Sequence, residues 1–208
     1  MRTPQCSEEF INQQRKLLKE QPDCGTAAYN LGVAALERGK LAEARAYFEE
    51  AVTTGSRMFE AWVNLGYIYF KEGDLEKVVE ANRRAVEIEP RYARGYANMG
   101  FAYLQMARTE EAIAALEKAL ELNPEMVQAW ANLANAYLQL DDVDKAIETG
   151  EKLVAFAPDF ALAHNNLAFA YYKKQDYARA IAHVDIARGL GFEVPPAFLA
   201  ALEPYRDK

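Results

Sequence analysis

Five asparagines recur at a fixed spacing of 34 residues along this 208-residue chain, at Asn30, Asn64, Asn98, Asn132 and Asn166. A side-chain amide carries a donor and an acceptor, so it can pair with the backbone N–H and C=O groups of a bound peptide whatever that peptide's side chains are. Asparagine is a poor helix former and costs about 0.6 kcal/mol per site relative to alanine, or roughly 3 kcal/mol for five. The series therefore predicts either a row of backbone-binding groups or an asparagine inherited with a duplicated unit.

Side chains suited to catalysis or metal binding are scarce. The only histidines are His164 and His183, and no cysteine or acidic residue stands at metal-ligand spacing to either. The sequence has no phosphate-binding glycine loop, nucleophile elbow or dinucleotide fingerprint. Acidic residues such as Glu49, Glu50 and Glu151 fall on stretches that we interpret as solvated helix faces. We therefore expect no enzyme activity, no metal and no other cofactor.

Composition and charge narrow the class of partner. Hydrophobic residues make up 51% of the chain and charged residues 26%, which is typical of a soluble globular protein. The net charge of −7 argues against nucleic acid and against an anionic membrane surface. Neither a signal peptide nor an apolar run of about 18 residues is visible, so we expect a cytoplasmic protein without membrane insertion. A predicted helix from Ser7 to Glu20 separates Cys6 from Cys24, which are therefore predicted to be free thiols.

The asparagines belong to a longer repeat. From Gly25 the chain divides into five predicted units, 25–58, 59–92, 93–126, 127–160 and 161–194. Each unit holds two amphipathic stretches, and the turn between them is short enough to force the two helices into an antiparallel pair. A period of this length predicts a stacked array of helix pairs rather than separate domains.

Boundary signals support these limits. A polar residue precedes or begins the second helix in four units and is predicted to cap it: Asp74, Thr109, Asp142 and Asp176. Proline closes three units, at Pro90, Pro124 and Pro158. We expect residues 1–24 to form a capping helix at the N-terminus, and residues 195–208 to form a short apolar capping helix and tail at the other end.

Aligned on the asparagine, the units share a second set of residues. The second unit reads Trp62, Leu65, Gly66 and Tyr69, followed by Ala85 and Pro90. This pattern resembles the tetratricopeptide repeat (TPR) family, whose signature is W-x₂-L-G-x₂-Y followed by alanine and proline. The resemblance covers residues 25 to about 194. It implies an all-α, right-handed superhelical solenoid of antiparallel helix pairs with capping helices at both ends, and a non-enzymatic protein that binds other proteins.

Some of the shared positions are predicted to pack the helices together. Small residues mark the point where the two helices of a unit cross, namely Gly32, Gly66, Gly100, Ala134 and Ala168. Asn82 and Gly150 stand where Phe48 and Leu116 predict a large apolar side chain, so we expect looser packing there, with a partner contact as the less favoured alternative. His164 holds the position of Trp62 and Trp130 and is interpreted as a core aromatic.

The opposite side of the first helices is the candidate binding surface. At 100° per residue these helices turn a second set of positions away from the packing set, and in the TPR family that direction is the concave groove. The surface is aromatic, amide-rich and near neutral or slightly basic, and its cations favour an acidic partner. The predicted peptide contacts are Asn30, Asn64, Tyr67, Phe70, Lys71, Arg94, Asn98, Phe101, Asn132, Asn135, Asn165, Asn166, Phe169, Tyr172 and Lys173.

Two other uses of this surface are a chaperone clamp and self-assembly. The carboxylate clamp of chaperone-binding TPR proteins needs a lysine four residues before an asparagine, but Ala131 stands there before Asn135. Asn166 has no third repeat to complete such a clamp. Self-assembly is the second alternative, with the helix from Ser7 to Glu20 or the C-terminal tail filling a neighbour's groove in a homo-oligomer. We favour a protein or peptide ligand bound along the groove.

Overall fold

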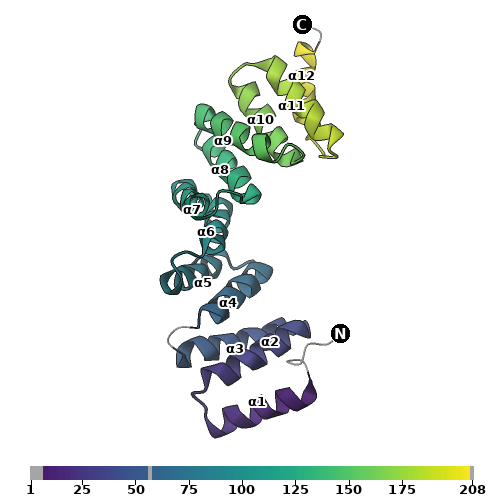
Figure 1. The fold of residues 1–208 in the computed structure, drawn as a ribbon. Coiled ribbons are helices and arrows are strands. Elements are labelled where there is room, and N and C mark those ends of the chain that lie inside the picture. Colours follow the sequence, from purple (N-terminus) through teal and green to yellow (C-terminus); the bar gives the residue numbers. More distant parts are fainter. Residues whose placement is uncertain (1–6, 56–57, 207–208) are drawn as a thin grey trace. The chain divides into compact units, whose positions relative to one another are not determined.

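The computed structural model describes residues 7–55 and 58–206 (Figure 1). Across those two ranges every regular element is a helix, which confirms the predicted all-α fold. The helices are α1 (Glu8–Glu20), α2 (Gly25–Glu37), α3 (Leu41–Thr54), α4 (Phe59–Glu72), α5 (Leu75–Ile88), α6 (Ala93–Gln105), α7 (Thr109–Leu122), α8 (Val127–Gln139), α9 (Val143–Phe156), α10 (Ala161–Lys173), α11 (Tyr177–Gly189), α12 (Pro196–Leu202) and the short 3₁₀ helix η2 (Glu203–Tyr205). Within the same ranges, no helix is long and apolar enough to cross a membrane.

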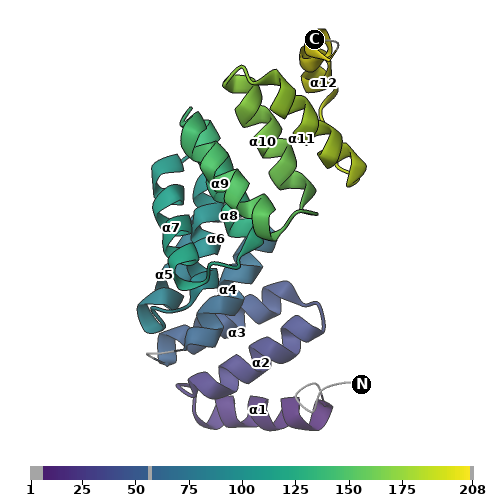
Figure 2. The ribbon, with the colours of Figure 1, turned by 45° about the horizontal axis from the view of Figure 1, so that its top comes forward.

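The chain forms two compact units, Met1–Met99 and Gly100–Lys208, and their boundary falls inside α6. In the first unit each of the helices α1 to α5 packs on the next, as Figures 1 and 2 show for α1, α2 and α3. In the second unit the same holds from α7 to α11, and α8 also contacts α10. Sequential packing of this kind is what an array of helix pairs requires. The limits of the five 34-residue units stay a prediction.

The helix pairs cross closely because small residues face large ones. A Cβ atom added at Gly32 would lie 2.7 Å from the Phe48 ring, and one added at Gly100 would lie 2.5 Å from Leu116 Cγ. In each case the large residue follows sixteen positions after the glycine. A Cβ added at Gly66 would likewise lie 2.9 Å from Nδ2 of Asn82, which is also sixteen positions later. At these three crossings the glycine therefore lets the opposite side chain approach the helix backbone.

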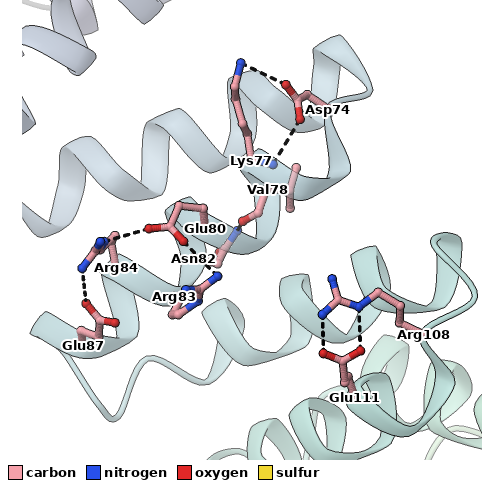
Figure 3. Close-up of polar contacts among 10 residues, drawn as sticks. All are labelled: Asp74, Lys77, Val78, Glu80, Asn82, Arg83, Arg84, Glu87, Arg108 and Glu111. Atoms are coloured by element: carbon pink, nitrogen blue, oxygen red, sulfur yellow. Dashed lines mark hydrogen bonds and ion pairs between the residues drawn. The ribbon is translucent and has the colours of Figure 1, made fainter.

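Looser packing at Asn82 and Gly150 is not what the structure shows, so that expectation is wrong. Asn82 is only 1% exposed, and its Nδ2 donates to the Val78 carbonyl (2.8 Å), as Figure 3 shows. Its Oδ1 accepts a hydrogen bond from Asn98 Nδ2 at 3.0 Å. At Gly150 the space is filled by Leu167, whose Cδ2 would lie 2.7 Å from an added Cβ. Both positions are filled from within the chain.

Helix starts follow the predicted caps except at α7. Ser7 Oγ accepts the Phe10 N–H (3.2 Å) at the start of α1. Three aspartates accept from the backbone N–H three residues ahead: Asp74 (3.2 Å, Figure 3), Asp142 (3.2 Å) and Asp176 (3.1 Å). The prediction for Thr109 is wrong, because Arg108 holds the cap position and Thr109 is the first helical residue. Its buried hydroxyl donates instead to Gln139 Oε1 (3.0 Å) on α8.

The cysteine prediction divides at the edge of the described residues. Cys24 is a free thiol at the start of α2, as expected. Cys6 and the rest of residues 1–6 lie outside the described residues, as do 56–57 and 207–208.

Close crossing predicts a large cost for one added methyl group. Gly100→Ala should lower the free energy of unfolding by about 1–3 kcal/mol, because the new Cβ overlaps Leu116 and forces the pair apart. Gly189→Ala is the matched control, since an added Cβ there meets nothing within 4 Å, and it should be neutral or slightly stabilising. Urea unfolding followed by circular dichroism measures both changes. Equal effects of the two substitutions would show that helix crossing does not depend on the glycine.

Candidate peptide-binding surface

The fifteen predicted contact residues lie on the first helices α2, α4, α6, α8 and α10, and none of them is fully buried. We call this set the first-helix surface. Tyr67 is 48% exposed, Phe70 47% and Phe169 40%, which is unusual for side chains of this size. The other exposed members are Lys71, Arg94, Asn98, Asn135 and Lys173. The half-buried members are Asn30, Asn64, Phe101, Asn132, Asn165, Asn166 and Tyr172.

In the compact unit Met1–Met99, α4 carries the most exposed part of this surface. Tyr67, Phe70 and Lys71 follow one another at the helical spacing that puts side chains on one face, and we call them the α4 patch. The Lys71 ammonium nitrogen lies 5.5 Å from the Tyr67 ring centroid, within the range of a cation–π contact. The α4 patch therefore offers a broad apolar area with one positive charge at its edge.

In the compact unit Gly100–Lys208, α10 repeats this arrangement with Phe169, Tyr172 and Lys173, which we call the α10 patch. Lys173 Nζ lies 5.8 Å from the Phe169 ring centroid. The Phe198 ring of α12 lies 5.6 Å from Phe169 and 5.5 Å from Tyr172, so the C-terminal helix contacts both aromatic rings of this patch. Lys173 also forms an ion pair with Asp141, which offsets its attraction for an acidic ligand.

The residues that follow α12 are also held in place, through contacts of Tyr205 and Arg206 with α11. The Tyr205 ring stacks on Tyr177 with centroids 3.6 Å apart. The Arg206 guanidinium donates two hydrogen bonds to Asp185, at 3.0 and 2.8 Å. The hydrogen bond from Arg206 is the main reason that the pKa of Asp185 lies below its usual range. Contacts at both ends hold α12 and the residues after it against α10 and α11.

The recurring asparagines bond to neighbouring helices. In three of them the side-chain Nδ2 is the donor: Asn30 to Gln14 Oε1 (3.0 Å), Asn98 to Asn82 Oδ1 (3.0 Å) and Asn166 to the Ala131 carbonyl (3.4 Å). The Asn64 side chain hydrogen-bonds to Tyr29. Burial raises the pKa of Tyr29, and the bond to Asn64 offsets part of that rise. These amides therefore link their helix either to the helix directly before it, as for Asn30 and Asn98, or to the preceding first helix, as for Asn64 and Asn166. Contact between the same side chains and a ligand stays a prediction.

One amide on this surface is unusual. Asn165 Oδ1 is a buried side-chain oxygen without a hydrogen-bond partner among residues 7–55 and 58–206. It belongs to α10, one residue before Asn166.

His164 is buried at the position that Trp130 holds one repeat earlier, which confirms its interpretation as a core aromatic residue. It is 6% exposed, and its Nε2 lies 2.9 Å from the Pro158 carbonyl oxygen. Trp130 makes the matching contact one repeat earlier, where its Nε1 donates to the Pro124 carbonyl (2.7 Å). Both rings therefore tie the start of their own helix to the proline turn that precedes it.

A second histidine meets His164 inside the last helix pair. The two Nδ1 atoms of His164 and His183 lie 2.9 Å apart. Because a carbonyl only accepts, His164 Nε2 carries its proton, and in the neutral pair His183 Nδ1 donates to His164 Nδ1. Burial first, and His164 second, lower the pKa of His183. Tyr171 stacks on His183 with centroids 5.6 Å apart.

The surroundings of the two histidines were compared with what a metal site requires. Over the described ranges, no three or more His, Cys, Asp or Glu side chains are grouped so that they can hold a metal ion. The two rings form one part-buried hydrogen bond within the last helix pair.

Tyrosines on three first helices bond to glutamates on preceding second helices, a feature that our sequence analysis missed. The hydroxyls donate from Tyr69 to Glu49 (2.9 Å), from Tyr137 to Glu117 (2.8 Å) and from Tyr171 to Glu151. Burial, followed by the bond to Glu151, raises the pKa of Tyr171 to about 12. The constant step of 20 residues from glutamate to tyrosine was visible in the sequence and is the signal that would have revealed these bonds.

Family models match most of this array. A model described as tetratricopeptide repeat matches residues 15–58 and 98–159, which is just over half of the chain. A second model, described as TPR repeat, matches residues 66–106. Among proteins of curated function, none matches the sequence.

Solved structures share the fold at low sequence identity. YrrB, described as a TPR protein with an unusual peptide-binding site, is 17% identical, with a TM-score of 0.76 over 86% of this chain and 93% of that one. MamA from Desulfovibrio magneticus RS-1 is 23% identical, with a TM-score of 0.74 over 80% and 94%. PilF of Pseudomonas aeruginosa is 24% identical, with a TM-score of 0.67 over 88% and 79%. At these identities the likeness establishes the fold alone.

The histidine pair predicts that the fold loses stability in acid. Because the pKa of His183 is lowered on folding, the unfolded chain binds this proton more readily. The contribution is therefore present above the ordinary histidine pKa of about 6.5 and is lost as the pH falls from there through the folded value. Urea midpoints between roughly pH 7.5 and 5.5 should fall accordingly.

A double substitution isolates this effect. His164→Trp with His183→Ala copies the side chains at the matching positions of other units, Trp130 and Ala115. This variant should show a flatter dependence of the urea midpoint on pH than the natural chain. An unchanged slope would mean that other groups, not the histidine pair, carry the acid sensitivity.

Proposed function

Because the chain belongs to the tetratricopeptide repeat family, we propose that it is a non-enzymatic interaction scaffold whose first-helix surface binds a peptide segment of another protein. One observation carries the proposal: Tyr67 and Phe70 leave almost half of their surface exposed on a single face of α4. Exposed aromatic side chains grouped in this way are typical of binding sites rather than of an inert surface. YrrB, which shares the fold and is described as having a peptide-binding site, adds support.

The parts of the surface have different roles in this proposal. Within the compact unit Met1–Met99, Tyr67 and Phe70 are the apolar anchors, and the side-chain amides of Asn64 and Asn98 pair with the ligand's backbone. The exposed cations Lys71 and Arg94 favour an acidic segment, although the whole chain carries a net charge of −7. Lys173 contributes little to this preference, since Asp141 already neutralises it.

Self-assembly is the second candidate function, and one contact favours it. The C-terminal segment already places Phe198 on the first-helix surface of its own chain, so the same segment has the chemistry to occupy a second copy. Light scattering across a wide concentration range separates the two candidates. A constant monomer mass excludes self-assembly, whereas a mass that rises with concentration and falls again after Phe198→Ala supports it.

The proposed surface predicts where a partner can be crosslinked. A photoreactive phenylalanine analogue at position 67 should capture a partner from the cell of origin, and the same analogue at position 156 should not. Phe156 is the matched control, because it is 47% exposed but lies on the second helix α9. Capture should fall by about tenfold or more after Phe70→Ser, the effect expected for an anchor residue. Equal capture at both positions would contradict the proposed surface.

A further inference from the structure

The last two helix pairs differ at one position beside a cluster of rings. In the pair α10 and α11, the His183 ring stacks on Tyr171 with centroids 5.6 Å apart and 4° between the planes. It also lies 5.2 Å from the His164 ring. The residues at the matching positions of α8 and α9, 34 residues earlier, are Thr149, Tyr137 and Trp130. A small side chain therefore stands in the earlier pair where the later pair has an imidazole ring.

A cavity of about 460 Å³ lies beside Thr149 in the compact unit Gly100–Lys208. Residues of α7, α8 and α9 line it, and α8 packs on both of the other helices (Figure 2). Its apolar and aromatic lining residues are Leu120, Trp130, Leu133 and Tyr137. The volume falls within the range of small-molecule sites in proteins. None of the fifteen residues of the first-helix surface lines this cavity, so it is a separate site.

Two polar groups of the cavity can bond to a ligand. Thr149 is only 6% exposed, and its hydroxyl forms no hydrogen bond in the described part of the chain. Alanine stands at the same position in two other helix pairs, at Ala81 and Ala115, so packing does not require this hydroxyl. Glu117 accepts the Tyr137 hydroxyl (2.8 Å) but forms no ion pair with any residue that the structure describes. Both groups therefore keep bonding capacity for a molecule in the cavity.

The later helix pair shows which kind of group fits beside these rings. The imidazole of His183 is a planar nitrogen heterocycle that stacks on Tyr171 and bonds through Nδ1 to His164 (2.9 Å). In the earlier pair, Lys145 Nζ lies 5.2 Å from the Tyr137 ring centroid. This ammonium group disfavours a second positive charge beside the same ring. A neutral ring is therefore a better fit than a cationic one.

We propose that this cavity binds a neutral, planar heterocycle of the imidazole type, stacked on Tyr137 as His183 stacks on Tyr171. The ring's bare nitrogen accepts the Thr149 hydroxyl, and its N–H donates to the Glu117 carboxylate. A free small molecule and a histidine side chain of a partner protein both present this chemistry. The inference goes beyond the proposed function, because it concerns a different surface of the molecule.

Benzimidazole is the probe, because its two fused rings carry one N–H donor and one nitrogen acceptor. It is titrated at neutral pH into the ¹⁵N-labelled full chain, and the side-chain Nε1–H signal of Trp130 is followed by NMR. The chain has two tryptophans, and Trp62→Phe assigns their signals. We expect a saturable shift with a Kd of about 1 mM, as for a ligand of this size. Indene has the same shape without nitrogen and should bind about three- to tenfold more weakly.

Two substitutions of Thr149 test the site itself. Thr149→His copies the later helix pair and fills the cavity with the chain's own ring, so the affinity for benzimidazole should fall by about tenfold or more. Thr149→Val keeps the side-chain shape and removes the hydroxyl, and it should weaken binding by about three- to tenfold. Tyr67→Ser is the control outside the cavity and should leave the affinity unchanged. Circular dichroism checks that each variant is folded. Unchanged affinity in both Thr149 variants would overturn the proposal.

A capped Gly-His-Gly peptide and 4-methylimidazole, tested in the same way, separate the two sources of the ring. Tighter binding of the peptide identifies a partner's histidine, and tighter binding of 4-methylimidazole identifies a free small molecule. Both results support the site. The proposal is overturned if benzimidazole causes no saturable shift up to about 10 mM, beyond the range of weak complexes, or if indene binds equally well. Crosslinking from position 67 tests the proposed function independently of these results.

Discussion

The close crossing of the two helices in each pair is the constraint on which the rest of the structure depends. A residue without a side chain, such as Gly32 or Gly100, lets Phe48 or Leu116 press directly against the opposite backbone. At Gly150 the space is filled from the following helix by Leu167. Tyrosine–glutamate bonds recur between successive helices packed in this way, as from Tyr69 to Glu49 and from Tyr137 to Glu117.

Function is assigned to what this packing leaves exposed. The asparagines that attract attention in the sequence bond mainly to neighbouring helices, as Asn98 does to Asn82. The aromatic side chains of α4 and α10 are of another kind, because packing within the helix pair does not bury them. On α10 the Phe198 ring packs against Phe169 and Tyr172 and still leaves Phe169 40% exposed, while Tyr67 and Phe70 on α4 are 48% and 47% exposed. This exposed aromatic area is the reason that we propose α4 as part of the binding surface.

The sequence predicted the parts of the fold that depend on period and residue size. The helix pairs, the three aspartate caps and the core role of His164 follow from spacing and from the residues at matching positions. The prediction that Thr109 caps α7 was wrong by one residue, because the sequence does not fix the exact residue at which the helix begins. The prediction of loose packing at Asn82 was wrong because Asn98, sixteen residues later, hydrogen-bonds to its buried side chain. Position in the repeat predicted Phe169 and Tyr172 as surface anchors, but it could not show that Phe198 of the C-terminal helix packs against both rings.

Hydrogen exchange on the complex with a crosslink-identified partner tests the central claim most directly. The account predicts slower exchange in peptides covering Phe59–Glu72 when the partner is bound, and unchanged exchange in those covering the second helix Val143–Phe156. Protection confined to second helices, with none in Phe59–Glu72, would contradict the assignment of α4 as the binding surface.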